Sequence, residues 1–202
     1  MPAYTENIAP SLAYVDGKLV IASNGPTPIY VNAKTGVKEG TVKLGSAEAY
    51  SVTNDEGKYI LYCNHANGGE TFKIWRSTGV DVEPELYHSF TNTTSLPMGA
   101  KMKVNGSLDG DALIVITNEG VPGVTESGMI TVVEVKNGAV ANTTVVDLSA
   151  VGTWGEAPVN IGTVVAASAD MADGWFTSQY EPSEFRWIKS DVTLGAAIPS
   201  DM

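Results

Sequence analysis

The sequence predicts an all-β fold of the β-propeller type, built as an array of about four four-stranded blades. One observation is a repeat: an apolar strand that ends in a tight turn recurs at intervals of roughly 40 to 60 residues, which is typical of propellers. The other is that no segment keeps an apolar period of 3.6 residues, so almost no helix is expected. The four turns lie at 33–36, 76–79, 135–138 and 188–191.

A second type of turn precedes the second strand of each repeat. These turns contain Asp-Gly or Asn/Asp clusters, which favour the positive φ angles of hairpin turns. They occupy 15–18, 54–58, 108–111 and 171–174. The second strands are expected at 19–22, 59–63, 112–116 and 175–177. Because these strands are apolar on both faces, we expect them to be sandwiched between neighbouring blades.

The third and fourth strands of each repeat differ in their pattern. The third strands are expected at 29–31, 72–75, 130–135 and 185–188. The fourth strands are expected at 40–44, 84–90, 144–148 and 192–196. Since the fourth strands alternate apolar and polar residues, they are interpreted as outer, half-solvated strands.

The repeat predicts a single domain over residues 1–202. Four blades is the lower limit for a propeller, which has about four to eight. No strand exchange that would close a ring is evident, and an open arc would expose apolar blade faces. The chain is therefore a segment of a larger propeller, a small closed ring, or an arc completed by another copy; a β-sandwich with similar hairpins is the alternative fold. The blades are placed at approximately 8–45, 46–91, 98–149 and 158–199.

Composition excludes several classes of protein. The chain has 43% hydrophobic and 17% charged residues, which is typical of a globular protein and not of a disordered one. Its net charge of −11 disfavours binding to the phosphate backbone of nucleic acids. No run of about 18 apolar residues is present, so no membrane span is expected. Residues 1–7 have neither a basic segment nor an apolar stretch, so no signal peptide is expected in this sequence.

Histidine and cysteine are sparse, with two and one residues respectively. Cys63 is the only cysteine, and it lies two residues before His65, on the same face if the strand continues. A working Cys–His pair also needs an orienting group and an oxyanion site, and neither is evident, so Cys63 is interpreted as a small buried residue. His65 and His88 lack the spacing of a metal site, and Asp109-Gly110-Asp111 is interpreted as a turn. We expect no metal site and no cofactor.

The loops between the second and third strands are the expected ligand-binding face. Trp154 lies between glycines and Tyr180 also lies in a loop, where exposed rings can stack on sugars while amides and carboxylates hold the hydroxyl groups. A structural alternative is that Trp154 closes the end of the propeller channel. The candidate ligand-binding residues are His65, Asn67, Glu119, Trp154, Glu156 and Tyr180.

Two stretches carry a resemblance to a known family. The run from Gly69 to Tyr87 contains Phe72-Lys73-Ile74-Trp75-Arg76 followed by Pro84-Glu85-Leu86. Together with residues 28–36, this run resembles a blade of uncharacterised propeller-like surface lipoproteins of gut bacteria. The resemblance implies an exported bacterial protein, at the cell surface or in the periplasm, linked to glycan capture and without established catalytic residues.

We therefore expect a non-catalytic extracellular or surface module that binds a ligand or acts as a scaffold, with a carbohydrate as the expected ligand. One alternative is a protein–protein interaction scaffold that pairs with another chain, or with itself, through exposed blade edges. Another is a glycan-active hydrolase or lyase that uses carboxylates of the loops and of the segments before first strands. Those carboxylates belong to Glu70, Glu119, Glu126, Glu156 and Glu181.

Overall fold

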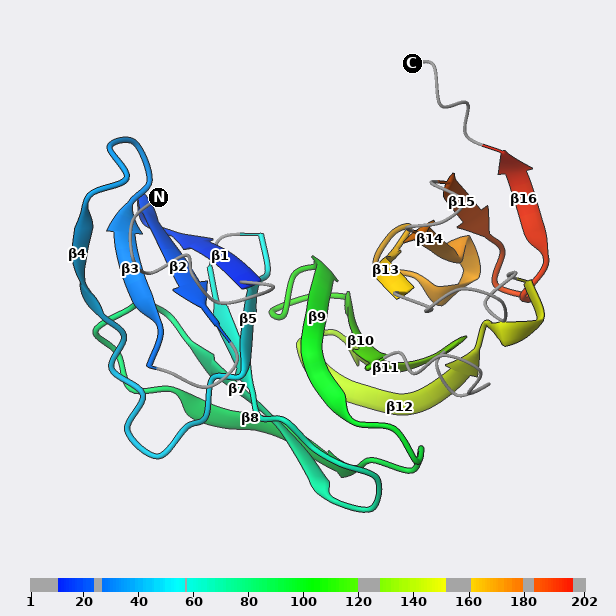
Figure 1. Cartoon of the computed structure of the whole chain (residues 1–202), viewed down its shortest axis with the longest axis horizontal. Helices are drawn as coiled ribbons and strands as arrows, with labels where there is room; N and C mark the ends of the chain where they lie inside the picture. Colours follow the sequence, from blue (N-terminus) through cyan, green and yellow to red (C-terminus); the bar gives the residue numbers. More distant parts are fainter. Residues whose placement is uncertain are drawn as a thin grey trace.

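The computed structural model describes residues 11–23, 27–56, 58–119, 128–151, 161–179 and 184–197. These residues form four separate four-stranded antiparallel sheets, each built from one contiguous stretch of chain. Figure 1 shows the sheets side by side in an arc that does not close into a ring. The prediction of an all-β, propeller-type array of four blades is thus confirmed.

Strand order follows chain order in every sheet, and the first strand of each sheet lies next to the first strand of the following sheet. The first sheet contains β1 (Ser11–Val15), β2 (Lys18–Ala22), β3 (Ile29–Asn32) and β4 (Lys38–Thr41). The second contains β5 (Ser51–Asn54), β6 (Ile60–Cys63), β7 (Thr71–Ser77) and β8 (Glu85–Thr91). The third contains β9 (Met98–Gly106), β10 (Ala112–Asn118), β11 (Met129–Lys136) and β12 (Ala139–Asp147). The fourth contains β13 (Ile161–Ala166), β14 (Trp175–Gln179), β15 (Glu184–Ile188) and β16 (Leu194–Ala197).

Two-residue turns set the register of the hairpins. Asp16 and Gly17 have φ angles of 45° and 73°, and the hairpin they close pairs Val15 with Lys18. Asn137 and Gly138 repeat this geometry between β11 and β12, with φ angles of 50° and 79°. Both central residues of such a turn need positive φ, which is why Asp-Gly and Asn-Gly occupy them.

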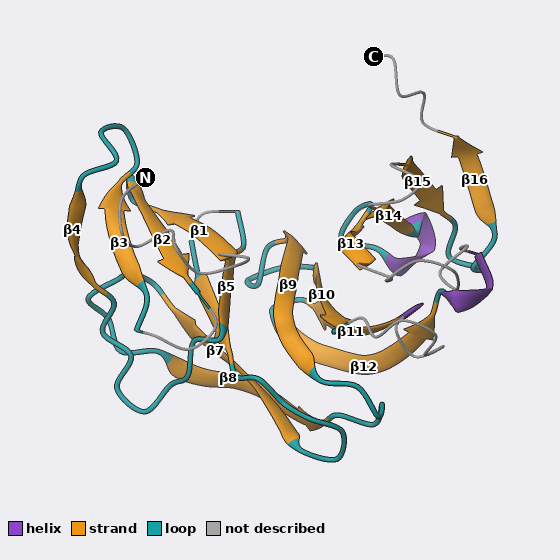
Figure 2. Ribbon diagram, viewed as in Figure 1, coloured by secondary structure: helices purple, strands orange, loops and turns teal. Residues whose placement is uncertain are grey.

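The described residues include two short 3-10 turns, η3 (Ser149–Val151) and η4 (Met171–Asp173) (Figure 2). The second forms where the sequence predicts a turn, and the carboxylate of Asp170 caps it by accepting a hydrogen bond of 2.9 Å from the backbone N–H of Ala172. Neither helical turn is long and apolar enough to cross a membrane.

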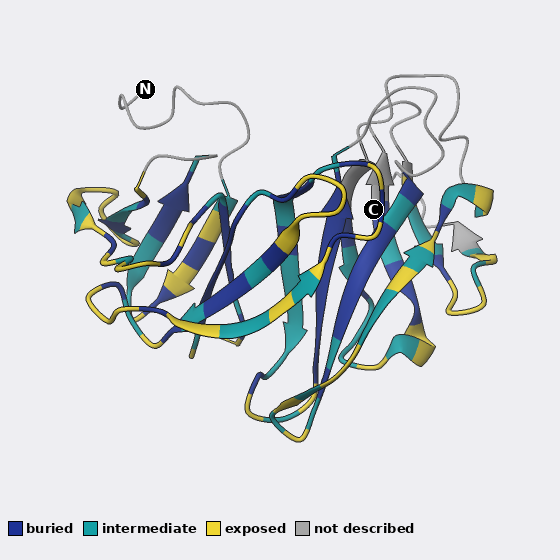
Figure 3. Ribbon diagram, turned by 90° about the horizontal axis from the view of Figure 1, so that it is seen from below, coloured by how far each residue is buried: buried dark blue, intermediate teal, exposed yellow. Residues whose placement is uncertain are grey.

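The core lies in the three interfaces between consecutive sheets, which we call the first, second and third seams. Every residue of β6 and of β10 is buried, as expected for strands that pack against neighbours on both faces. The large side chains of Tyr62, Phe72 and Trp175 fill the first, second and third seams respectively. In Figure 3, buried segments run through the strands while exposed residues lie in the turns and along the outer strands.

Side chains also form hydrogen bonds across each seam. At the second seam, the carboxylate of Asp55 accepts a hydrogen bond of 3.0 Å from the backbone N–H of Leu108, and His88 Nε2 lies 2.9 Å from Thr143 Oγ1. Comparable contacts hold the first seam, where Val52 N–H donates to Ser11 Oγ, and the third, where Asn105 donates to Ala166 O.

Two fourth strands differ from their predicted ranges by more than two residues at one end. The strand expected at 40–44 ends at Thr41, because the chain then leaves the sheet: Val42 packs into the first seam and Lys43 N–H donates to Val80 O at 2.9 Å. The strand expected at 144–148 begins earlier, at Ala139, directly after its turn. In this case the turn, and not the later apolar alternation, sets where the strand begins.

Candidate ligand-binding site at the second seam

Three polar side chains from two sheets meet at the end of the second seam. His65 Nε2 lies 3.1 Å from Glu119 Oε1, and the hydroxyl of Tyr50 donates to the same carboxylate oxygen at 3.5 Å. The rings of Tyr50 and His65 are tilted by 57°, with their centroids 4.7 Å apart. Tyr50 directly precedes β5 and His65 follows β6, whereas Glu119 follows β10, so the cluster joins the second and third sheets.

The backbone on both sides of His65 is fixed. Asn64 Oδ1 accepts a hydrogen bond of 2.7 Å from Lys73 N–H, and Ala66 forms a two-way backbone bridge with Met98 at 3.1 and 3.0 Å. Gly99, with a φ angle of 124°, allows the His65 loop to pack closely on β9, because a Cβ atom at this position would overlap the carbonyl oxygen of Asn64. His65 is therefore held at the edge of the third sheet by residues of its own loop.

Tyr50 and Glu119 are anchored in the same way. The backbone N–H of Tyr50 donates to Cys63 O and that of Glu119 donates to Pro97 O, both at 2.7 Å. Each anchor is part of the strand framework, so the three side chains start from fixed positions. Such pre-ordering lowers the conformational entropy lost when a ligand binds.

The cluster is partly open to solvent. The side chains of His65 and Glu119 are 31% and 33% exposed. Partial burial raises the pKa of the Tyr50 phenol, and the neighbouring Glu119 carboxylate raises it further, so Tyr50 keeps its proton and acts as a hydrogen-bond donor. The site thus combines a donor hydroxyl, a carboxylate acceptor and two partly exposed rings.

The residues predicted from sequence fall into three groups. His65 and Glu119 are brought together, a contact that no sequence pattern indicates. Asn67 instead closes a turn in its own loop, where its backbone and side-chain N–H groups both donate to Glu70 Oε2. The remaining three, Trp154, Glu156 and Tyr180, lie outside the described residues.

Tyr50 was missed by the sequence analysis. It lies in Ala47-Glu48-Ala49-Tyr50, a stretch without a recognisable motif. The only available signal was its place just before a first strand, on the same side of the arc as the loops between second and third strands. That position becomes informative only when the neighbouring sheet is known.

Cys63 does not take part in the cluster. It is fully buried in the second seam, where its Sγ lies 3.1 Å from Ser51 Oγ and donates to Gly99 O at 3.4 Å. Burial raises the pKa of the thiol to about 11. Because the thiolate is the reactive form, Cys63 is not suited to act as a nucleophile.

The acidic turns have structural partners. Asp109 contacts Lys58 and accepts from the hydroxyl of Tyr59 at 2.9 Å, while Asp111 accepts from the backbone N–H of Asn137 at 2.9 Å. Among the described residues, no group of three or more His, Cys, Asp or Glu side chains could hold a metal ion.

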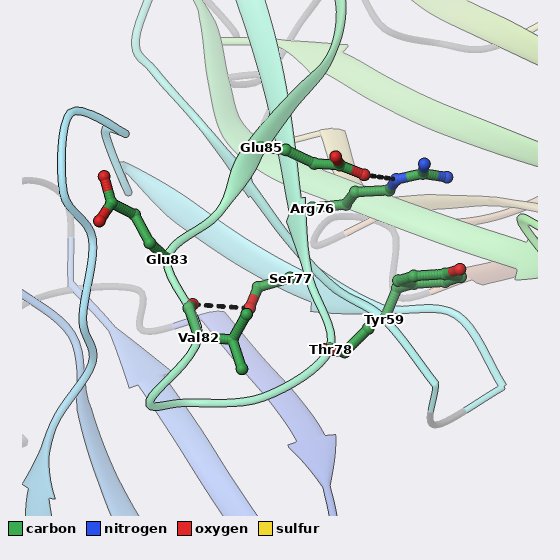
Figure 4. A pocket seen from close by; sticks show the side chains of 7 residues that line it. All are labelled: Tyr59, Arg76, Ser77, Thr78, Val82, Glu83 and Glu85. Carbon is green, nitrogen blue, oxygen red and sulfur yellow. Dashed lines mark hydrogen bonds and ion pairs between the residues drawn. The ribbon is translucent and has the colours of Figure 1, made fainter.

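A shallow cavity of about 240 Å³ lies on the opposite rim of the second sheet (Figure 4). Its most polar group, Arg76, donates from Nε to Glu85 Oε1 at 2.8 Å. The same guanidinium lies over the rings of Tyr59 and Tyr87, at 5.0 and 4.7 Å from their centroids. Because Arg76 is already engaged by a carboxylate and two rings, we interpret this cavity as a structural feature of the rim.

Comparison with known proteins places the chain in a family. Residues 2–200 match the family described as Domain of unknown function (DUF8500). The chain belongs to the DUF8500 family. No curated protein was found to match this DUF8500 chain.

Solved structures resemble the DUF8500 chain in fold. A DUF4623 family protein from Bacteroides eggerthii is 13% identical, with a TM-score of 0.66 over 96% of this chain and 46% of that one. KlAtg21, solved in complex with the coiled-coil of AgAtg16, is 12% identical, with a TM-score of 0.51 over 100% of this chain and 61% of that one. The DUF8500 chain thus spans about half of the first structure. At these identities, the likeness extends to the fold alone.

Proposed function

We propose that this DUF8500 protein is a non-catalytic binding module that holds a carbohydrate at the second seam. The observation that carries the proposal is the contact between His65 and Glu119 across the seam, with the Tyr50 ring tilted against the imidazole. A partly exposed ring offers a stacking surface for the apolar face of a sugar, and a carboxylate beside it accepts hydrogen bonds from hydroxyl groups.

The charge of the protein supports a neutral ligand. The chain has a net charge of −11, so anionic ligands would meet long-range repulsion. Glu119 would add a local repulsion to this effect at the site itself. Neutral glycans carry hydroxyl groups without charge, and they match both the overall field and the groups of the cluster.

Binding is favoured over hydrolysis by the partners of the glutamates. Glycoside hydrolysis usually needs two carboxyl groups about 5 to 9.5 Å apart that face the scissile bond. Glu119 is paired with His65, whereas Glu70 accepts two hydrogen bonds from Asn67 in its own turn. Glu70 and Glu119 are thus engaged separately, and the carbohydrate proposal requires only Glu119.

The proposal is tested by glycan-array screening, followed by calorimetry on the best glycan. We expect the parent protein to bind, and Tyr50→Leu and Glu119→Gln each to weaken binding by about tenfold, which corresponds to about 1.4 kcal/mol. The control is Glu85→Gln, a matched change at a carboxylate on the opposite rim that pairs with Arg76. A parent protein that retains no glycan, or a control that loses as much affinity as Glu119→Gln, would contradict the proposal.

We also propose that the protein is exported to the bacterial surface or the periplasm, in line with the resemblance of residues 69–87 to surface lipoproteins. Proteinase added to intact cells should degrade a surface protein, and proteinase added after outer-membrane permeabilisation should reach a periplasmic one. Protection under both conditions would rule out this location.

A scaffold role that includes self-association is the second candidate. It is favoured by exposed apolar side chains on the two terminal sheets: Leu12 and Tyr14 on the first, Phe185 on the fourth. Apolar surface of this kind is characteristic of interaction sites. Sedimentation of the parent chain tests this candidate, and a strictly monomeric chain would exclude self-association.

A further inference from the structure

The first sheet has an apolar face that no other sheet covers. The register of β1, β2 and β3 places two rows of three side chains on this face. Leu12 and Tyr14 are about half exposed, at 46% and 50%, although each lies in the innermost strand of its sheet. The two rows are Leu12, Ile21 and Ile29, and Tyr14, Leu19 and Val31. Ile21 and Val31 are themselves buried, at 9% and 4% exposed, so the open part of this face lies around Leu12 and Tyr14 of β1.

The fourth sheet has the corresponding feature at the other end of the arc. Its uncovered face contains Val165, Phe176 and Trp187, which are paired across β13, β14 and β15. Phe185 lies on the same face, where its ring stacks on Phe176 with centroids 5.7 Å apart, and it is 48% exposed. The opposite face of this sheet, with Trp175, packs into the third seam.

In the second sheet, both the face toward the preceding sheet and the face toward the following sheet are covered. Its face toward the first sheet includes Ile60 and Tyr62, and its face toward the third sheet includes Leu61 and Phe72. All four residues are fully buried. The uncovered face of the first sheet is equivalent to the face of the second sheet that packs on the first. The uncovered face of the fourth sheet is equivalent to the face of the second sheet that packs on the third. The two uncovered faces are therefore the two halves of one more seam.

One chain does not bring these halves together, because the arc stays open (Figure 1). The length of a similar fold indicates that a second copy of the chain brings the two faces together. The chain spans 46% of the Bacteroides eggerthii structure, so two copies have about the length of one whole chain of that fold. The family match over residues 2–200 includes all four sheets.

We infer that two copies of this protein pair head to tail, with the fourth sheet of each packed against the first sheet of the other, to form one closed ring. Two arcs of four sheets give eight, within the range of about four to eight blades that propellers use. The contact is heterologous but closes after two copies, so the ring has a two-fold axis. This inference rests on the scaffold proposal and is independent of the carbohydrate proposal.

Sedimentation equilibrium with two charge variants tests the ring. We expect the parent to have twice the mass of one chain. Tyr14→Lys and Phe185→Glu change exposed side chains on the two faces, and each should weaken the dimer by roughly a hundredfold because it buries an unpaired charge. Leu86→Lys is the matched control, since Leu86 is 55% exposed but lies on the outer strand β8. Circular dichroism should show that all variants keep the parent fold.

Mixing the two variants is the decisive step. A head-to-tail dimer of one Tyr14→Lys chain and one Phe185→Glu chain has one unaltered contact and one Lys–Glu contact, so dimers should re-form in a one-to-one ratio. A parent that stays monomeric overturns both self-association and the ring. Two results would overturn the ring but not self-association. One is a parent that dimerises while the mixed variants do not re-form dimers. The other is a parent whose mass grows beyond that of two chains.

Discussion

Asp55 is the polar residue on which the second seam depends most directly. Its side chain is buried, with 1% of the residue exposed, at the turn between β5 and β6. Oδ1 accepts from the backbone N–H of Tyr59 at 2.7 Å, and Oδ2 accepts from the backbone N–H of Leu108 in the third sheet at 3.0 Å. One carboxylate therefore closes a hairpin and ties two sheets together.

Asp55→Ala should lower the free energy of unfolding by about 2 to 4 kcal/mol. Each buried N–H left without a partner costs about 1 to 3 kcal/mol, and removing a buried charge offsets part of the total. Asp55→Asn keeps one acceptor oxygen, so it should lose about half as much. These losses are large against the roughly 5 to 15 kcal/mol by which domains are stable.

The assay is urea unfolding at about pH 7, followed by tryptophan fluorescence and linear extrapolation to water. Glu56→Ala is the control: it removes a carboxylate from the neighbouring, exposed position and should change stability by less than about 0.5 kcal/mol. An Asp55→Ala protein as stable as the control would refute the argument. Equal losses in the Ala and Asn variants would show that the two hydrogen bonds do not contribute separately.

Two further predictions concern titratable groups of the second sheet. Burial lowers the pKa of His88 below 6.5, so the unfolded chain takes up a proton before the folded one does and stability should fall as pH drops below about 6.5. His88→Gln should flatten this part of the curve in urea midpoints measured between about pH 7.5 and 5; an unchanged slope would contradict the assignment. Cys63 should react with a thiol reagent only when the second seam opens, so its modification should be slow in the folded protein and fast in urea. Fast labelling without urea would disprove the burial of the thiol.

The sheets were predictable from sequence because their signals are local. Asp16-Gly17 and Asn137-Gly138 fix hairpins through φ angles that few residue pairs adopt, and a strand that is apolar on both faces, such as β10, must lie between two layers. β4 was misplaced because Val42 continues the alternation after the chain has left the sheet to pack into the first seam.

The candidate site was only partly predictable because it forms between sheets. His65 and Glu119 could be selected singly as polar loop residues, but their contact depends on how the second and third sheets meet. The close packing of the His65 loop on the third sheet depends in turn on Gly99, whose positive φ no sequence pattern predicts. Asn67 has the same loop position and chemistry as a ligand-binding amide, yet it is used by Glu70 to close a turn. Local patterns cannot distinguish these two uses of an asparagine.

Each sheet is built from one contiguous stretch of chain, which has a consequence for how the protein opens. In the described part of the chain, no strand joins the two terminal sheets, so a terminal sheet can detach while the other sheets keep their backbone pairs. Amide hydrogen exchange should therefore be graded, fastest in β1–β4 and β13–β16 and slowest in β6 and β10, as in a linear repeat array that frays from its ends. If the terminal sheets of two chains pack together, amide exchange in β1–β4 and β13–β16 would slow toward the rates of the inner sheets. Exchange rates in the terminal sheets would then depend on protein concentration.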